Sequence, residues 1–139
     1  MNWSEHVHAK LARAGLKRGG ARERVIELLA GQDCALSAIE IDGTLRDAGF
    51  PTGRASIYRT LELLVEHGLV ERVEVGDGQA RFERRREDHH HHLVCERCGR
   101  LIAFDDPGLE RAISRLSDRL GVRVSGHEVL LRGECASCD

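Results

Sequence analysis

Two kinds of metal-binding side chain are concentrated in one short stretch of the chain. Four consecutive histidines, 89–92, are followed closely by a Cys-x2-Cys pair, Cys95 and Cys98, and a second such pair stands at Cys135 and Cys138. Neutral imidazole and thiolate are ligands of borderline-soft transition metals, and two Cys-x2-Cys pairs can enclose one zinc ion in a four-cysteine shell. The histidine run is internal and leads directly into the first cysteine pair, which favours a metal role over a plain surface loop or a purification tag.

The four histidines divide into two pairs if their segment is extended, because side chains alternate between the two faces of a strand. His89 and His91 then point to one side, and His90 and His92 point to the other. The pattern therefore predicts two pairs of ligands that serve two different sites.

The chain has 139 residues, of which 41% are hydrophobic and 32% charged, enough for one ordinary domain or two small ones. No apolar run approaches the length of a membrane span, and no secretory signal is visible, so we expect a cytoplasmic protein without a membrane partner. Thiols stay reduced in that compartment, and five cysteines are an odd number. Paired cysteines therefore indicate metal rather than disulfides.

The formal net charge of −2 does not by itself indicate a nucleic-acid-binding protein. Its distribution is more informative, because basic residues cluster near the N-terminus with only Glu5 and Glu23 among them. This cluster is weak evidence for a phosphate-binding surface, and a solvated helix face fits it nearly as well. The basic residues are Lys10, Arg13, Lys17, Arg18, Arg22 and Arg24.

The first part of the chain reads as short helices followed by a β-hairpin. Helices are expected over 4–14, 21–30, from the capping residue Ser37 to about 48, and over 54–67, and strands over 69–75 and 79–85. This order is typical of a winged helix-turn-helix, whose last helix enters the major groove of DNA. The buried stripe of that helix is predicted as Ile57, Leu61, Leu64 and Val65.

The start of the last of these helices carries the candidate base contacts. Tyr58 and Arg59 are exposed on the expected wheel, and arginine is the usual bidentate partner of guanine or phosphate. An ordinary helical subdomain with Tyr58 half-buried is the competing interpretation.

The pattern changes after the Cys95–Cys98 pair. We expect a strand over 101–104, a helix that opens at 105–108 and ends at Gly121, and strands over 122–125 and 127–132. The helix has a predicted buried stripe, and the apolar residues on both faces of the last strand indicate a sheet covered on both sides, for which we expect a second subunit as the cover. The stripe consists of Leu109, Ala112, Ile113, Leu116 and Leu120.

The expected fold class is therefore α+β, with an N-terminal winged helix-turn-helix over 1–84 and a C-terminal α/β dimerisation and metal-binding domain over 85–139. The charged segment 84–88 is the expected hinge.

The chain resembles the ferric uptake regulator family of bacterial metal-dependent repressors over nearly its whole length. The resemblance rests on the combination of several motifs and implies a homodimer that binds double-stranded DNA at a palindromic operator. The motifs are Tyr58-Arg59-Thr60-Leu61, Gly68-Leu69-Val70, the run 89–95, Cys98-Gly99, His127 and Cys135-x2-Cys138.

By position, the resemblance implies three metal sites. Cys95, Cys98, Cys135 and Cys138 correspond to a structural zinc shell, and His89, His91, Glu110 and His127 correspond to a site inside the dimerisation domain. Glu83, His90 and His92 correspond to a regulatory site at the domain junction. Its further ligand matches Ala35, which cannot bind metal, so Cys34 or Glu71 is expected to substitute, with a buried inert thiol as the alternative for Cys34.

The resemblance also implies DNA contacts. Lys17 and Arg22 match positions near the DNA backbone or minor groove, and Arg54 and Ser56 join Tyr58 and Arg59 as candidates at the recognition helix. Gly19-Gly20-Ala21-Arg22 replaces a threonine-led helix start, which leaves that helix less well capped.

Together these observations predict a metal-responsive repressor, not an enzyme, with zinc favoured as corepressor in the manner of a zinc uptake regulator. Iron-sensing is the nearest alternative, followed by manganese and nickel. A metal-buffering protein also stays open, whereas a zinc hydrolase lacks a His-Glu-x2-His helix or a deaminase signature. Ala103 replaces an aspartate of peroxide-sensing relatives, and Arg85 replaces a cysteine of zinc-sensing ones.

Overall fold

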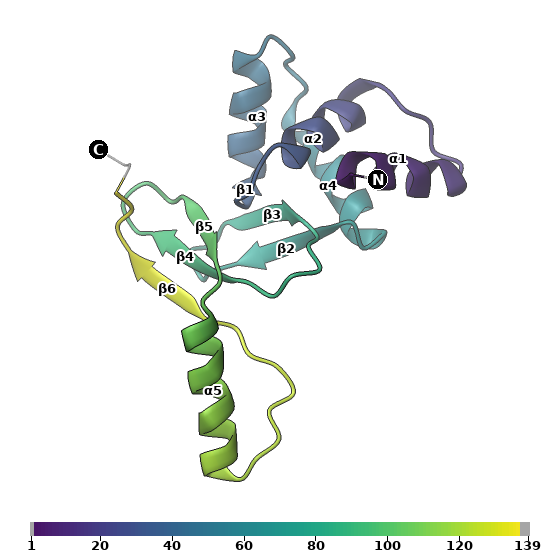
Figure 1. Cartoon of the computed structure of the whole chain (residues 1–139). Helices are drawn as coiled ribbons and strands as arrows, with labels where there is room; N and C mark the ends of the chain where they lie inside the picture. Colours follow the sequence, from purple (N-terminus) through teal and green to yellow (C-terminus); the bar gives the residue numbers. More distant parts are fainter. Residues whose placement is uncertain (1, 137–139) are drawn as a thin grey trace. The chain divides into compact units, whose positions relative to one another are not determined.

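The computed structural model describes residues 2–136, so Cys138 lies outside the described residues. The chain divides into two compact units, of which the first ends at Glu87 and the second begins at Asp88. Helices and strands occur in both (Figure 1), and the predicted α+β class is confirmed. No helix of the described part is long and apolar enough to cross a membrane.

The first unit has the element order of a winged helix. Four helices precede a β-hairpin, and a two-residue strand before the third helix adds a third strand to its sheet (Figure 1). The elements are α1 Trp3–Arg13, α2 Gly20–Ala30, β1 Leu36–Ser37, α3 Ala38–Asp47, α4 Arg54–Glu66, β2 Val70–Glu74 and β3 Ala80–Arg84.

Local sequence explains where these helices begin. Ser37 caps α3 through a capping box, in which its hydroxyl accepts from the Glu40 backbone and the Glu40 carboxylate accepts from the Ser37 backbone. In contrast, α4 starts after Gly53, which has φ +87° and provides no side-chain cap. One apolar cluster from all four helices and the hairpin forms the core, with Val25, Ile41, Ile57, Leu61 and Phe82 among its buried members.

The hairpin sheet has the antiparallel strand order β1-β3-β2. Arg81 points inward from β3 and is only 1% exposed, and its guanidinium lies 2.9 Å from the Asp77 carboxylate in the β2–β3 turn. This ion pair ties the tip of the wing to the sheet beneath it.

The second unit is a three-stranded sheet with one helix. Strand order is β5-β4-β6, with β4 and β5 antiparallel and β4 and β6 parallel, in register at Leu93 and Leu131. A parallel pair requires a long crossover, which α5 and the following loop provide (Figure 1). The elements are β4 His91–Cys95, β5 Leu101–Phe104, α5 Pro107–Leu120 and β6 Leu130–Gly133.

The apolar stripe of α5 is not buried in the single chain, contrary to the prediction. No residue of α5 is buried, and Leu116 and Leu120 are 42% and 61% exposed. The helix itself is well defined by its sequence, because Asp106 caps its start, Pro107 stands at its first turn, and Gly121 ends it with φ +68°.

Three further details of the prediction are wrong. Val65 is 37% exposed, because it lies to one side of the stripe centred on Ile57, Leu61 and Leu64. Residues 122–125 form no strand, since β5 and β6 occupy both edges of β4 and no described strand pairs with this segment. The last strand begins at Leu130 rather than at residue 127.

Candidate nucleic-acid interface and metal centres

The N-terminal half of α4 presents polar side chains on its exposed face. Tyr58 is 44% exposed, Arg59 is exposed, and the guanidinium of Arg59 donates to the Ser56 hydroxyl at 3.0 Å. A ring exposed to this extent is also compatible with the competing interpretation, in which Tyr58 is half-buried in a plain helical subdomain, so that alternative stays open. Exposed aromatic and arginine side chains on such a helix can reach base edges in a groove.

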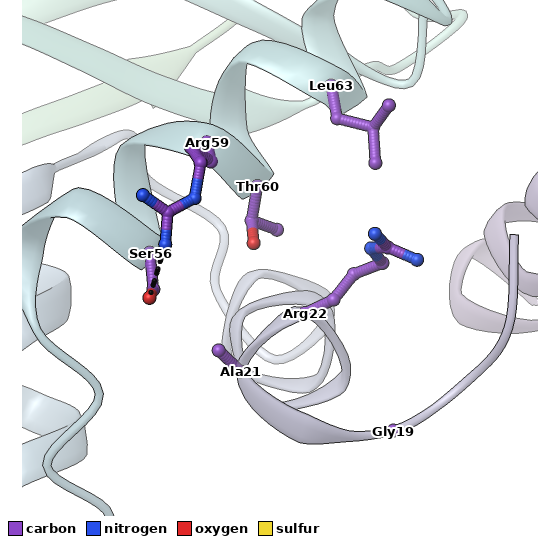
Figure 2. Close-up of a pocket in the computed structure, with 7 residues that line it drawn as sticks. All are labelled: Gly19, Ala21, Arg22, Ser56, Arg59, Thr60 and Leu63. Atoms are coloured by element: carbon purple, nitrogen blue, oxygen red, sulfur yellow. Dashed lines mark hydrogen bonds between the residues drawn. The ribbon is translucent and has the colours of Figure 1, made fainter.

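A hollow of about 360 Å³ lies between the start of α2 and the middle of α4. Arg22 and Arg59 stand on opposite sides of Thr60 at this hollow (Figure 2). None of the described residues that line it is acidic, and an Arg22 nitrogen donates to the carbonyl of Lys17 at 3.1 Å. The predicted candidates Arg22, Ser56 and Arg59 are thus brought together, and the exposed Lys17 lies beside them. This basic environment suits an anion such as a DNA phosphate.

Arg54 takes a different position, at the first residue of α4. Its Nε lies 3.5 Å from the carboxylate of Asp42 in α3, which is 5% exposed and also accepts from Arg46 at 3.2 Å. Sequence reasoning missed Asp42. The available signal was that Asp42 falls in the helical spacing of the buried stripe Ala38, Ile41 and Leu45, where a carboxylate needs a cationic partner.

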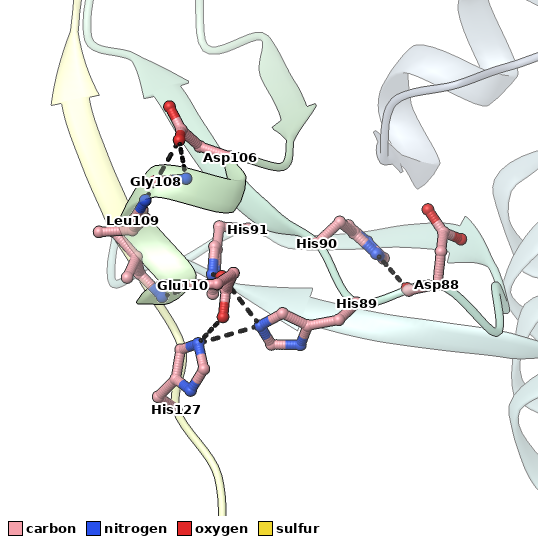
Figure 3. Close-up of polar contacts among 10 residues, drawn as sticks. Asp88, His89, His90, His91, Asp106, Gly108, Leu109, Glu110 and His127 are labelled. Carbon is pink, nitrogen blue, oxygen red and sulfur yellow. Dashed lines mark hydrogen bonds and ion pairs between the residues drawn. The ribbon is translucent and has the colours of Figure 1, made fainter. Parts of the chain in front are cut away.

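Four potential metal ligands meet inside the second unit. His89 precedes β4, His91 begins it, Glu110 lies in the first turn of α5, and His127 lies in the loop before β6. Figure 3 shows the three imidazoles converging on Glu110, while His90 points away toward Asp88. The alternation of neighbouring histidines therefore appears in the structure as the extended segment predicts.

The contacts within this cluster are short. The Glu110 carboxylate lies 2.6 Å from His91 Nε2 through one oxygen and 2.7 Å from His127 Nε2 through the other. His89 Nε2 lies 3.1 Å from His127 Nε2, and one potential ligand atom from each residue lies within 4.8 Å of the others. His91 is 1% exposed, so the cluster has a buried side.

The hydrogen bond from His91 holds the pKa of Glu110 below its usual range, with His127 adding to the effect against the opposing influence of burial. Glu110 is therefore a carboxylate at neutral pH. The backbone N–H of Val129 lies 3.1 Å from His91 Nδ1, which favours a proton on Nε2, shared with Glu110. A metal ion that binds Nε2 has to displace that proton. A neutral His91 then carries its proton on Nδ1, which can no longer accept the hydrogen bond from the Val129 backbone.

The cluster fits a transition metal by donor type and spacing. Ligand atoms of a tetrahedral zinc bound by nitrogen and oxygen are about 3.3 Å apart, given bond lengths of about 2.0–2.1 Å. Four of the contacts between donor atoms measure 2.6–3.5 Å, and one ligand atom from each residue lies within 4.8 Å of the others, so the donors must move apart or together to reach that arrangement. Three imidazoles and one carboxylate suit zinc, iron or nickel.

A second cluster joins Cys95, Cys98 and Cys135 at the ends of β4 and β6. The sulfurs of Cys98 and Cys135 are 3.6 Å apart, close to the roughly 3.8 Å expected between two thiolates on one zinc ion. Cys95 Sγ accepts the backbone N–H groups of Cys135 and Cys98, each at 3.3 Å. The fourth predicted member, Cys138, lies outside the described residues.

These contacts give the cysteine thiols different pKa values. Hydrogen bonds from the Cys135 and Cys98 backbones lower the pKa of Cys95 to about 6, which makes it a thiolate at neutral pH. For Cys98, the Arg100 backbone hydrogen bond lowers the pKa, but the neighbouring thiols and burial outweigh it and leave the pKa raised. A thiolate held by two backbone donors is a metal-ready ligand.

The remaining candidates are distributed over both units. The rings of His90 and His92 are 4.9 Å apart on one side of the strand. Glu83 is buried in β3 of the first unit, so its joint site with this histidine pair remains a prediction. Cys34 is half-buried, 3.9 Å from the Gln32 amide oxygen, and Glu71 is exposed on β2. The choice between these two as a further ligand also remains open.

Comparison with known proteins points to one family. Residues 13–132 match the family model described as the ferric uptake regulator family. The ferric uptake regulation protein of Klebsiella pneumoniae is 35% identical over 130 residues, which cover 93% of this chain and 84% of that protein.

Solved structures agree. The Vibrio cholerae ferric uptake regulator is 33% identical with a TM-score of 0.76, over 92% of this chain and 98% of that one. The Helicobacter pylori ferric uptake regulator is 26% identical with a TM-score of 0.78, over 98% of this chain and 91% of that one.

Proposed function

The chain belongs to the ferric uptake regulator family, a family of metal-responsive, DNA-binding transcription regulators, and from that premise we propose that it is a metal-activated repressor controlling metal homeostasis. We assign DNA binding to the first unit, through Tyr58, Arg59, Lys17, Arg22, Arg54 and Ser56. We assign metal binding and homodimer formation to the second unit.

The observation that carries this proposal is the cluster of His89, His91, Glu110 and His127. Three imidazoles and a carboxylate from three segments of the second unit meet at hydrogen-bond distances on a partly buried surface. Burying this many polar groups costs free energy unless each group has a hydrogen-bond partner, so packing alone does not explain the cluster. The Helicobacter pylori relative is described as having three functional metal binding sites, which supports assigning three here.

The proposed roles of the three sites differ. The cysteine set, completed by Cys138, holds a structural zinc, and the cluster around Glu110 supports the dimerisation domain. His90 and His92 with Glu83, and Cys34 or Glu71, form the regulatory site. A divalent ion bound there would be coordinated by ligands from both units and would link the two units.

Repression follows from the geometry that DNA demands. Successive major-groove faces on one side of a duplex are about 34–36 Å apart, so a homodimer on a palindromic operator must hold its two α4 helices at that spacing. Ligands from both units that share one ion restrict the units to fewer arrangements. Metal acts as corepressor if it binds the DNA-competent arrangement more tightly than the others.

We favour zinc as the sensed metal because imidazole with a possible thiolate suits it. Iron is the second candidate, and the names of the relatives favour it, since those from Klebsiella pneumoniae and Vibrio cholerae are called ferric uptake regulators. A metal buffer without operator binding is the remaining alternative.

The test combines metal content with DNA binding. Untagged protein purified without chelator is analysed by elemental mass spectrometry, and its affinity for duplexes that it selects from a random library is measured by fluorescence anisotropy. We expect two to three zinc ions per protomer, and operator affinity that falls at least tenfold when the weaker zinc is stripped. The double variant His90→Ala, His92→Ala is expected to keep the structural zinc and lose the metal dependence.

Other outcomes separate the alternatives. About one zinc per protomer, with iron restoring operator binding, identifies an iron sensor. Protein without any zinc contradicts the four-cysteine site, and so does a stable Cys95→Ser variant that holds as many zinc ions per protomer as wild type. Metal loading without selection of any duplex sequence identifies a buffer and contradicts the repressor.

A further inference from the structure

Asp42 is a carboxylate at a position that the core of the first unit should fill with an apolar side chain. It shares the buried face of α3 with Ala38, Ile41 and Leu45, and its side chain is 7% exposed. A charge so placed destabilises a fold unless it is paired. Its partners are two arginines from two different helices.

The first partner, Arg46, follows one turn later on α3. Its Nη2 lies 3.2 Å and 3.4 Å from the two oxygens of Asp42. The second partner, Arg54, is the first residue of α4, and its Nε lies 3.5 Å from Asp42 Oδ2. Both arginine side chains are more than half exposed, at 63% and 60%, so the buried carboxylate anchors two cations at the surface.

Arg54 stands at the wrong end of its helix for stability. The positive end of the helix dipole lies at the N-terminus, where acidic residues stabilise and basic residues destabilise. The first turn of α4 contains no acid, and Gly53 gives no side-chain cap. Asp42 offsets this arrangement from outside the helix. A residue choice that opposes local stability and is compensated elsewhere is typical of a functional position.

The contact through Nε leaves the outer edge of the Arg54 guanidinium available. Neither Nη nitrogen of Arg54 hydrogen-bonds another residue in the part of the chain that the structure describes. These two nitrogens form the parallel donor pair that binds O6 and N7 of guanine. Residues at the start of a recognition helix are the ones that reach base edges.

We propose that Asp42 is a positioning residue that holds Arg54 for bidentate recognition of a guanine in the operator. This rests on the proposed DNA-binding function of α4. Arg46 holds the other side of the carboxylate, and the three residues together keep one net positive charge toward DNA.

The test measures base discrimination. Duplexes are selected from a random library by metal-loaded wild-type protein, and affinities are measured for the selected duplex and for copies with each G·C pair replaced by A·T. Wild type is expected to lose about tenfold at one such pair, the size of one bidentate contact. Asp42→Asn is expected to bind the selected duplex about tenfold more weakly and to distinguish the two bases at that pair less than twofold. Arg54→Gln is expected to do the same.

Asp47→Asn is the matched control, because Asp47 is an exposed carboxylate at the end of the same helix. It removes the same charge and is expected to keep the guanine preference. In the Arg54→Gln background, Asp42→Asn is expected to have no further effect on discrimination.

Several results overturn the proposal. If Asp42 only stabilises the fold, Asp42→Asn lowers the affinity for every duplex by the same factor and keeps the guanine preference. If Asp42→Asn does not fold, Arg54→Gln decides, because glutamine lacks the guanidinium fork that binds O6 and N7 of guanine. Retention of the guanine preference by Arg54→Gln contradicts the proposal. Wild-type protein that selects no sequence contradicts the DNA-binding function itself.

Discussion

Two buried charged side chains of the first unit, Asp42 and Arg81, are paired with more exposed partners near the surface. Asp42 is paired with Arg46 and Arg54, and the fully buried Arg81 is paired with Asp77 at the wing tip. In each case the buried member fixes the direction of the exposed one. Such pairs cost desolvation and are worth more for position than for stability.

The Asp77–Arg81 pair predicts a pH dependence of stability. The hydrogen bond from Arg81 holds the folded-state pKa of Asp77 below its ordinary value of 3.8. The contribution of the pair to the free energy of unfolding is therefore complete above that value and lost as the pH falls through the folded-state pKa. Asp77→Asn is expected to be less stable than wild type by a constant amount between about pH 7 and 5, with the difference shrinking below about pH 4.

Urea unfolding curves recorded at stepwise lower pH measure this difference directly. A difference between wild type and Asp77→Asn that stays the same down to about pH 3 contradicts the assignment.

Which residues meet at the candidate sites could be predicted from the sequence only in part. Alternation in an extended segment predicted that His89 and His91 separate from His90 and His92. The approach of Glu110 and His127 to within 2.7 Å depends on the exact start of α5 and the path of the loop before β6. Local pattern holds no information on those distances, and residue correspondence with the family supplied the pairing instead.

At the scale of elements, the sequence predicts where helices begin and end more clearly than it predicts which residues are buried. The Ser37 capping box, the Asp106 cap and Gly121 define helix ends that sequence reading located within a residue or two. Alternating apolar residues at 122–125 predicted a strand that is absent, because a strand needs a neighbour with a vacant edge. Val65 shows the same limit for helices, since periodicity does not fix how wide a buried stripe is.

The Ser37 cap predicts a measurable loss of stability. The hydroxyl is almost completely buried and satisfies the Glu40 backbone N–H, so Ser37→Ala is expected to lower the free energy of unfolding by about 1 kcal/mol. Glu40→Gln is the control, since a glutamine oxygen can still accept from the Ser37 backbone. Chemical denaturation measures both variants, and equal losses in the two contradict a specific role for the hydroxyl.

At the scale of the whole molecule, the second unit carries more exposed apolar surface than a monomer needs. Leu116, Leu120, Val122, Val124 and Leu131 are all more than 40% exposed. The sequence showed the apolar stripe of α5 but could not tell whether this chain or another covers it. The proposed homodimer assigns that surface to a second copy.

Leu116→Glu is expected to weaken the homodimer by about 100-fold or more, because each protomer forfeits a buried leucine worth roughly 1.5–3 kcal/mol. Ser114→Glu adds the same charge to the opposite side of α5 and is expected to leave association unchanged. Sedimentation equilibrium gives both dissociation constants. Equal association of wild type and Leu116→Glu places the interface elsewhere.

The parallel pairing of β4 with β6 has a kinetic consequence. His92 pairs with Leu130, so this pairing forms only when the 37 intervening residues, 93–129, have been looped, at an entropic penalty of roughly 3 kcal/mol. Both donor clusters straddle this same closure, one linking 89–91 to His127 and the other linking 95–98 to Cys135. We therefore expect an ion that is bound by either cluster before β6 pairs to bring the two ends of this loop together. Refolding of the second unit is then expected to be faster in the presence of zinc than in the presence of a chelator.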